Sequence, residues 1–66
     1  MKITGETKVI GIFGYPVSHS LSPLLQNVAL EHLGLNYIYL PFEVRPESLE
    51  SAVNGIKALG ISGVNV

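Results

Sequence analysis

The chain has 66 residues and a mass of 7.1 kDa, so it is one small domain or part of one. It has no cysteine, which excludes disulfides and thiolate metal sites, and its two histidines have no acidic cluster beside them, so no metal site is expected. A net charge of −1 gives no electrostatic footprint for nucleic acid. With 47% hydrophobic and 14% charged residues, the composition is that of core material in a chain too short to bury much of it.

No segment has the pattern of a targeting signal or a membrane span. The N-terminal residues 1–6 are polar and have no apolar core of a signal peptide. The apolar runs are far shorter than the roughly 20 residues that a membrane-spanning helix needs. The absence of cysteine fits a reducing compartment. We therefore expect a cytoplasmic protein that has no membrane partner.

The first half of the chain predicts a strand, a loop and a helix. Residues 8–13 (KVIGIF) are a short apolar run rich in β-branched side chains and end at a glycine, as a buried strand would. A polar loop follows. Ser22 is a favourable N-cap and Pro23 suits the first helical position, so a helix is expected over 23–33. Its apolar residues recur at helical spacing, and a glycine follows it.

The second half predicts a strand, another helix and a third strand. Residues 37–44 (YIYLPFEV) include Pro41, which cannot donate to a ladder and therefore suits an edge strand. Pro46 opens a helix that carries an apolar stripe and ends before Gly60. Residues 61–66 (ISGVNV) begin a third strand.

This order of elements, β-α-β-α-β, is typical of parallel strands joined by right-handed crossover helices. We therefore predict an α/β fold, the start of an open, mostly parallel sheet in three layers with strand order 2-1-3. Such an order creates a switch point between the first and third strands, and ligands of open α/β sheets bind beyond the carboxyl ends of the strands there. The loop 14–22 and the end of the third strand, at Asn65 and Val66, border that crevice.

The loop residues 18–23 (SHSLSP) concentrate hydroxyl groups just before a helix N-terminus. Such a terminus attracts anions because its N–H groups are unpaired and the helix dipole is positive there. Serine hydroxyls can donate to a carboxylate or to sugar-like hydroxyls, so the expected ligand is a small polar anion. On spacing alone a simpler interpretation is favoured, in which Ser22 caps the helix and Ser20 closes a turn.

Other polar and aromatic residues leave alternatives open. His19 is a general acid or base or, as we favour, a loop histidine that hydrogen-bonds the backbone. Asn27 is a polar surface residue or one that reaches back toward the loop. Tyr37 and Tyr39 are expected to pack or to reach the surface. Residues 11–14 (GIFG) lack the third glycine of a dinucleotide fingerprint and are interpreted as turn and packing residues.

Residues 14–23, which read GYPVSHSLSP, resemble the Gly-x-Pro-x-x-His-Ser-x-Ser-Pro signature of shikimate dehydrogenases. Residues 63–66 (GVNV) are similar to the start of the family's Gly-x-Asn-Val-Thr-x-Pro-x-Lys motif. Between these two segments lie further matching residues: Asn27, Gly34, Leu35, Tyr39 and Phe42. The resemblance covers about residues 8–66, which is nearly the whole chain.

The resemblance implies the N-terminal, substrate-binding part of an enzyme that reduces 3-dehydroshikimate to shikimate with NADPH, in aromatic amino acid biosynthesis. By position, Ser20 and Ser22 would hydrogen-bond the substrate carboxylate, and Asn65 would help to shape the crevice beside the substrate. The family's catalytic lysine and aspartate fall beyond Val66, as does the Rossmann domain that binds NADP. We therefore expect residues 1–66 to contain no catalytic or cofactor-binding residue and to be inactive alone.

Two alternatives remain. In the first, the chain is a non-catalytic α/β module that self-associates through the open edge of its third strand, because such edges invite pairing. In the second, the parent enzyme acts on quinate as well as shikimate or accepts NAD. The residues that separate these activities lie largely beyond Val66, so shikimate and NADP are favoured on prior expectation.

Overall fold

The structure, a computed structural model, describes residues 2–66 and has the predicted order of elements. The strands are β1 (Lys8–Gly14), β2 (Tyr37–Glu43) and β3 (Gly63–Asn65). The helices are α1 (Ser22–His32) and α2 (Leu49–Leu59), and a short 3-10 helix, η1 (Pro46–Ser48), precedes α2. The strands are parallel and stand in the order β2-β1-β3, so the predicted α/β fold and strand order are confirmed.

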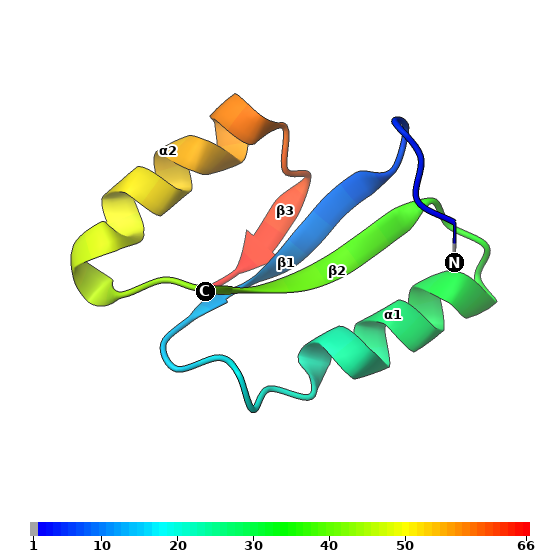
Figure 1. Cartoon of the computed structure of the whole chain (residues 1–66), viewed down its shortest axis with the longest axis horizontal. Helices are drawn as coiled ribbons and strands as arrows, with labels where there is room; N and C mark the ends of the chain where they lie inside the picture. Colours follow the sequence, from blue (N-terminus) through cyan, green and yellow to red (C-terminus); the bar gives the residue numbers. More distant parts are fainter. Residues whose placement is uncertain (1) are drawn as a thin grey trace.

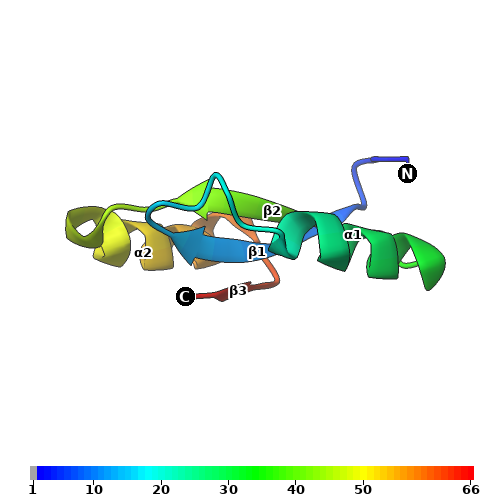
Figure 2. The same ribbon diagram turned by 90° about the horizontal axis from the view of Figure 1, so that it is seen from below.

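The sheet lies between the two helices, as Figure 1 shows. In the view of Figure 2, β1 lies between β2 and β3, and α1 and α2 lie on opposite sides of the sheet. Right-handed crossovers produce this arrangement because β2 and β3 are added on opposite sides of β1. The loop between β1 and α1 lies at the carboxyl ends of the strands (Figure 1).

The strand register decides which side chains share a face of the sheet. Ile10 is paired with both Tyr39 and Gly63, and Ile12 with both Pro41 and Asn65. Since successive side chains of a strand point to opposite faces, Tyr39 and Asn65 share one face, whereas the paired Phe13 and Phe42 occupy the other. The two phenylalanine rings meet edge to face there, with their centroids 5.8 Å apart.

The two helix starts differ from the prediction. Ser22 is the first residue of α1 and not its N-cap, because Leu21 occupies the N-cap position and no side chain there caps the helix. Instead, the Ser20 hydroxyl oxygen accepts a hydrogen bond from the Ser22 N–H at 3.2 Å, which satisfies one of the free donors of the first turn. Pro46 opens η1 rather than α2, which begins at Leu49; a 3-10 turn is a frequent start of a helix.

The end of α2 agrees with the prediction. Gly60 follows the helix in the left-handed conformation, with φ of 70°, and the N–H of Ile61 returns to the carbonyl oxygen of Ile56 at 2.9 Å. β3 is shorter than the predicted 61–66, since pairing with β1 covers only Gly63–Asn65. The turn that ends α2 includes Gly60 and Ile61, which lie before the start of β3.

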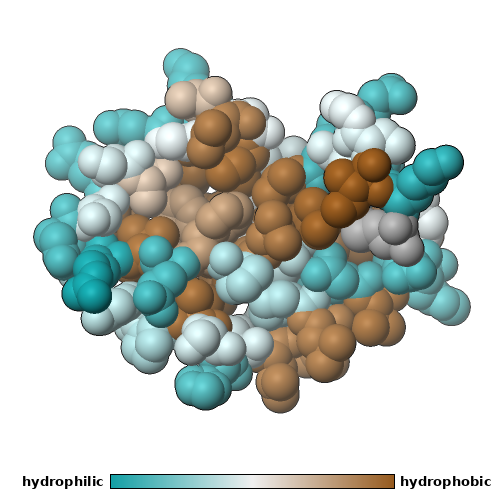
Figure 3. Space-filling view, viewed as in Figure 1, coloured by the Kyte–Doolittle hydropathy of each residue, from teal (hydrophilic) through white to brown (hydrophobic). Residues whose placement is uncertain are grey.

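Few side chains are buried in residues 2–66. The buried apolar residues are Phe13, Val17 and Tyr39, and neither helix contains a buried residue. On α1, the side chains of Leu25 and Val28, which recur at helical spacing, are 64% and 63% exposed. Figure 3 shows apolar side chains gathered over α1, at the lower right of the view. The apolar composition of the chain is therefore largely surface in this structure.

Candidate functional site

The loop between β1 and α1 is anchored at its centre by Val17. The side chain of Val17 is buried, and its carbonyl oxygen accepts a hydrogen bond from the N–H of Ser20 at 3.0 Å. The peptide bond between Tyr15 and Pro16 is cis. The anchored turn delivers Ser20 to the start of α1, at the carboxyl end of the sheet.

The structure brings Ser20 and Ser22 together at the N-terminus of α1. Both residues are partly buried. The Ser20 oxygen is engaged by the Ser22 N–H, so the hydroxyl proton of Ser20 stays available to a ligand. Among residues 2–66, the hydroxyl of Ser22 has no hydrogen-bond partner. Two hydroxyl donors at the positive end of a helix form an arrangement that suits a carboxylate.

Asn65 is the last residue of β3 and is exposed, with its side chain on the α1 side of the sheet. Its Nδ2 donates to the hydroxyl of Tyr39 at 3.4 Å. Tyr39 belongs to β2, the opposite edge strand, and its side chain is only 4% exposed. The predicted site residue is therefore held by an aromatic side chain that reaches it across the central strand.

Asn27 has a role that neither sequence interpretation included. From the middle of α1, its Nδ2 donates to the carbonyl oxygen of Tyr39, and its Oδ1 accepts from the N–H of Tyr39, both at 2.8 Å. Asn27 is thus neither a free surface residue nor one that reaches back to the loop. Sequence reasoning missed Tyr39 as a site residue as well, although Tyr39 is one of the residues that match the family, and that match was the signal that could have identified it.

No hydrogen bond connects Ser20 or Ser22 with Asn65 in the part of the chain that the structure describes. The three predicted residues come from three segments, with Ser20 in the loop before α1, Ser22 at the start of α1 and Asn65 at the end of β3. The side chain of His19 is exposed and makes no backbone hydrogen bond within residues 2–66, so that interpretation of His19 was wrong.

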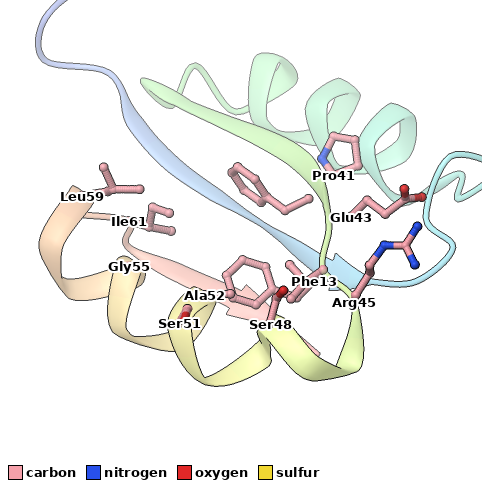
Figure 4. Close-up of a pocket in the computed structure, with 12 residues that line it drawn as sticks. Phe13, Pro41, Glu43, Arg45, Ser48, Ser51, Ala52, Gly55, Leu59 and Ile61 are labelled. Atoms are coloured by element: carbon pink, nitrogen blue, oxygen red, sulfur yellow. The ribbon is translucent and has the colours of Figure 1, made fainter.

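A groove of about 680 Å³ lies on the other side of the sheet, between α2 and β2. Figure 4 shows its lining, in which Phe13 of β1 faces Ala52 of α2, with Leu59 and Ile61 at one end. The lining is mainly apolar and contains none of the three predicted site residues. Its polar lining residues include one cation, Arg45, and one carboxylate, Glu43. We take the serine loop as the candidate site because it holds the predicted residues Ser20 and Ser22 at the N-terminus of α1.

Two other kinds of feature were sought in residues 2–66. No helix there is long and apolar enough to cross a membrane. No group of three or more histidine, aspartate or glutamate side chains that could hold a metal ion is found in the same range.

An open parallel sheet with a hydroxyl-bearing loop at its switch point defines this chain as a ligand-binding α/β unit. Residues 12–66 match the family model of the shikimate dehydrogenase substrate binding domain. The chain therefore belongs to the shikimate dehydrogenase substrate-binding domain family.

Several relatives resemble the chain over its whole length. A shikimate dehydrogenase (NADP(+)) of Geobacter metallireducens is 65% identical over 66 residues, which are 100% of this chain and 23% of that protein. The crystal structure of shikimate dehydrogenase from Aquifex aeolicus has a TM-score of 0.95 at 48% identity, and the match covers 98% of this chain and 24% of that one.

A second similar structure was solved with ligands. Shikimate 5-dehydrogenase from Listeria monocytogenes, in complex with shikimate and NAD, has a TM-score of 0.94 at 45% identity, covering 100% of this chain and 23% of that one. The present chain thus spans about a quarter of the length of the proteins that it matches.

Proposed function

We propose that this chain is the N-terminal part of the substrate-binding domain of an NADP-dependent shikimate dehydrogenase, and that it presents the loop that binds the substrate carboxylate. The observation that carries the proposal is the hydrogen bond from the Ser22 N–H to the Ser20 hydroxyl oxygen at the start of α1. The family membership of the chain and its 65% identity to a shikimate dehydrogenase (NADP(+)) of Geobacter metallireducens support the same assignment.

In the proposed reaction, a hydride passes from NADPH to the ketone carbon of 3-dehydroshikimate and gives shikimate. The NADP-binding domain and the catalytic lysine and aspartate belong to the part of the enzyme that follows residue 66 in this family. Residues 1–66 contribute binding and orientation of the substrate. NADP is proposed over NAD from the name of the Geobacter relative, whereas the Listeria complex contains NAD.

The roles of the three residues follow from their donors and acceptors. Ser20 would donate its hydroxyl proton to one carboxylate oxygen, because its own oxygen is engaged by the Ser22 N–H. Ser22 would donate to the other oxygen, and the positive end of α1 adds a favourable field for the anion. Asn65 would border the substrate ring from the end of β3.

The experiment is an NMR titration of the ¹⁵N-labelled chain with shikimate and, in parallel, with its uncharged methyl ester. We expect saturable shifts of the Ser20 and Ser22 amide signals with millimolar shikimate and much smaller shifts with the ester, which lacks the carboxylate charge. Ser22→Ala is expected to weaken binding about tenfold or more, the range for a hydrogen bond to a charged group. Ser18→Ala, in the same loop, is the matched control and is expected to bind like the unmodified chain.

Two results would contradict the proposal. One is equal binding of shikimate and its methyl ester, and the other is an absence of shifts in a sample whose dispersed spectrum shows that it is folded. A spectrophotometric assay of shikimate oxidation with NADP is expected to detect no turnover by residues 1–66. Turnover would show that these residues include the catalytic groups, against the assignment made here.

A second candidate function rests on the open edge of β3. Among the described residues β3 pairs with β1 alone, so the backbone groups of Gly63 and Asn65 that face away from β1 have no strand partner. A second copy of the chain offers the same unpaired edge. We propose that copies of residues 1–66 associate through this edge when no other strand covers it.

A further inference from the structure

We propose that Tyr39 is a positioning residue for Asn65 and that Asn27 in turn fixes Tyr39. This inference deepens the proposed function and rests on it, because Asn65 is there assigned to the substrate crevice. Its basis is a chain of hydrogen bonds that runs from α1 through β2 to the end of β3.

The first link is the free edge of β2. The N–H of Val44 bonds to β1 at Gly14, so the backbone groups of the even-numbered residues of β2 point to β1. The backbone groups of Tyr39 and Pro41 point away from it, since orientation alternates along a strand. Pro41 has no N–H and needs no acceptor there, whereas Tyr39 has both an N–H and a carbonyl oxygen to satisfy. The Asn27 amide supplies a partner for each of them, both at 2.8 Å.

This pairing fixes the backbone of Tyr39 more firmly than one bond could. The side-chain amide of Asn27 has a donor and an acceptor in one plane. It pairs with the N–H and the carbonyl oxygen of Tyr39 as the backbone of a neighbouring strand would. The two bonds form a closed ring between α1 and β2, which sets both the position and the direction of the strand at Tyr39. The position of the Tyr39 Cβ on the sheet is therefore fixed.

The second link is the Tyr39 side chain. It lies on the α1 face of the sheet, where its strand partner is Ile10, and it is 4% exposed. It also lines a hollow of about 350 Å³ together with residues of the other two strands, among them Gly63 and Asn65. Burial leaves the ring little rotational freedom, so its hydroxyl is a fixed point beyond the central strand.

The third link is the amide of Asn65. Asn65 is exposed in this structure, so packing against residues 2–66 does little to fix its side chain. Among residues 2–66, its side chain makes one hydrogen bond, the 3.4 Å contact from Nδ2 to the Tyr39 hydroxyl. The amide is planar, so holding Nδ2 also sets the direction of Oδ1, which is left to accept a hydrogen bond from a ligand hydroxyl.

The test compares Tyr39→Phe with Tyr37→Phe, a tyrosine on the same strand and face whose hydroxyl has no hydrogen bond among the described residues. We expect Tyr39→Phe to move the side-chain NH₂ signals of Asn65 toward those of the exposed Asn54. The NH₂ signals of Asn27 and the thermal midpoint should stay nearly unchanged. Tyr37→Phe is expected to leave the Asn65 signals in place.

Shikimate titrations supply the second readout. The dissociation constant is expected to rise about two- to tenfold in Tyr39→Phe, the range for one neutral hydrogen bond, and to stay unchanged in Tyr37→Phe. If the unmodified chain does not bind shikimate but the Asn65 signals still move, the proposed function fails and the positioning by Tyr39 stands. If the Asn65 signals stay unchanged in folded Tyr39→Phe, the inference is wrong.

Asn65→Ala tests the same contact from the other side and protects against a Tyr39 variant that does not fold. Asn65 is exposed, so its truncation is expected to leave the fold intact. The ring signals of Tyr39 should shift in this variant, and those of Tyr37 should not. Unchanged Tyr39 signals would overturn the inference independently of the first variant.

Discussion

Gly11 is the residue at which the sheet leaves no room for a side chain. A Cβ at this position would collide with the carbonyl oxygen of Leu40 and lie 2.8 Å from a ring carbon of Phe42. We expect Gly11→Ala to lower the free energy of unfolding by about 1–3 kcal/mol, because a backbone atom cannot move aside easily. Urea denaturation measures the change. Gly63→Ala is the control, with no atom within 4 Å of its Cβ, and an equal loss there would contradict this explanation.

At the scale of the element, Gly55 inside α2 and Gly60 just after it are predicted to respond to alanine substitution in opposite directions. Gly60 has φ of 70°, so Gly60→Ala should lower the free energy of unfolding by about 1–2 kcal/mol. Gly55 lies inside the helix, and its Cβ would meet only Leu59 Cδ1, at 4.0 Å. Gly55→Ala should raise stability by about 0.5–1 kcal/mol. Thermal unfolding followed by circular dichroism measures both, and a shared sign would refute the prediction.

At the scale of the whole molecule, the open edge of β3 predicts concentration-dependent association. We expect sedimentation velocity to show a growing dimer fraction as the concentration rises. The N–H of Ser62 bonds to Val9 on β1, so the N–H of Gly63 faces the open edge. Gly63→Pro removes that donor and is expected to shift the chain toward the monomer, whereas Gly63→Ala should still associate. A folded chain that stays monomeric at every concentration would rule out this mode of association.

The high apolar content of the chain is also explained at the scale of the whole molecule. The apolar residues of α1 follow a helical pattern, and the sequence predicts that they pack, yet Leu25 and Val28 are exposed in residues 2–66. Parallel sheets are normally covered on both faces. The match covers 23% of the Geobacter relative, so a protein of that length has further residues that are available to cover such side chains.

Local patterns in the sequence determined the elements and their order. Turn residues such as Gly60 and Pro46 mark where helices end and begin, and Pro41 identifies β2 as an edge strand. The right-handed crossover rule then fixes the face on which each helix lies, once β2 and β3 stand on opposite sides of β1. The serine pair of the candidate site was also predictable from a local pattern, since Ser20 and Ser22 are two residues apart at the start of α1.

Contacts between distant residues were decided only by the tertiary structure. Asn27 and Tyr39 are 12 residues apart, and Tyr39 and Asn65 are 26 residues apart. Whether such residues meet depends on the strand register and on the face to which each side chain points. Neither quantity is encoded in a local pattern, and a shift of one residue in register would turn Tyr39 to the opposite face. The sequence by itself therefore determined the order of the elements and the hydroxyl-bearing loop, while the packing of α1 on the edge of β2 decided what holds Asn65.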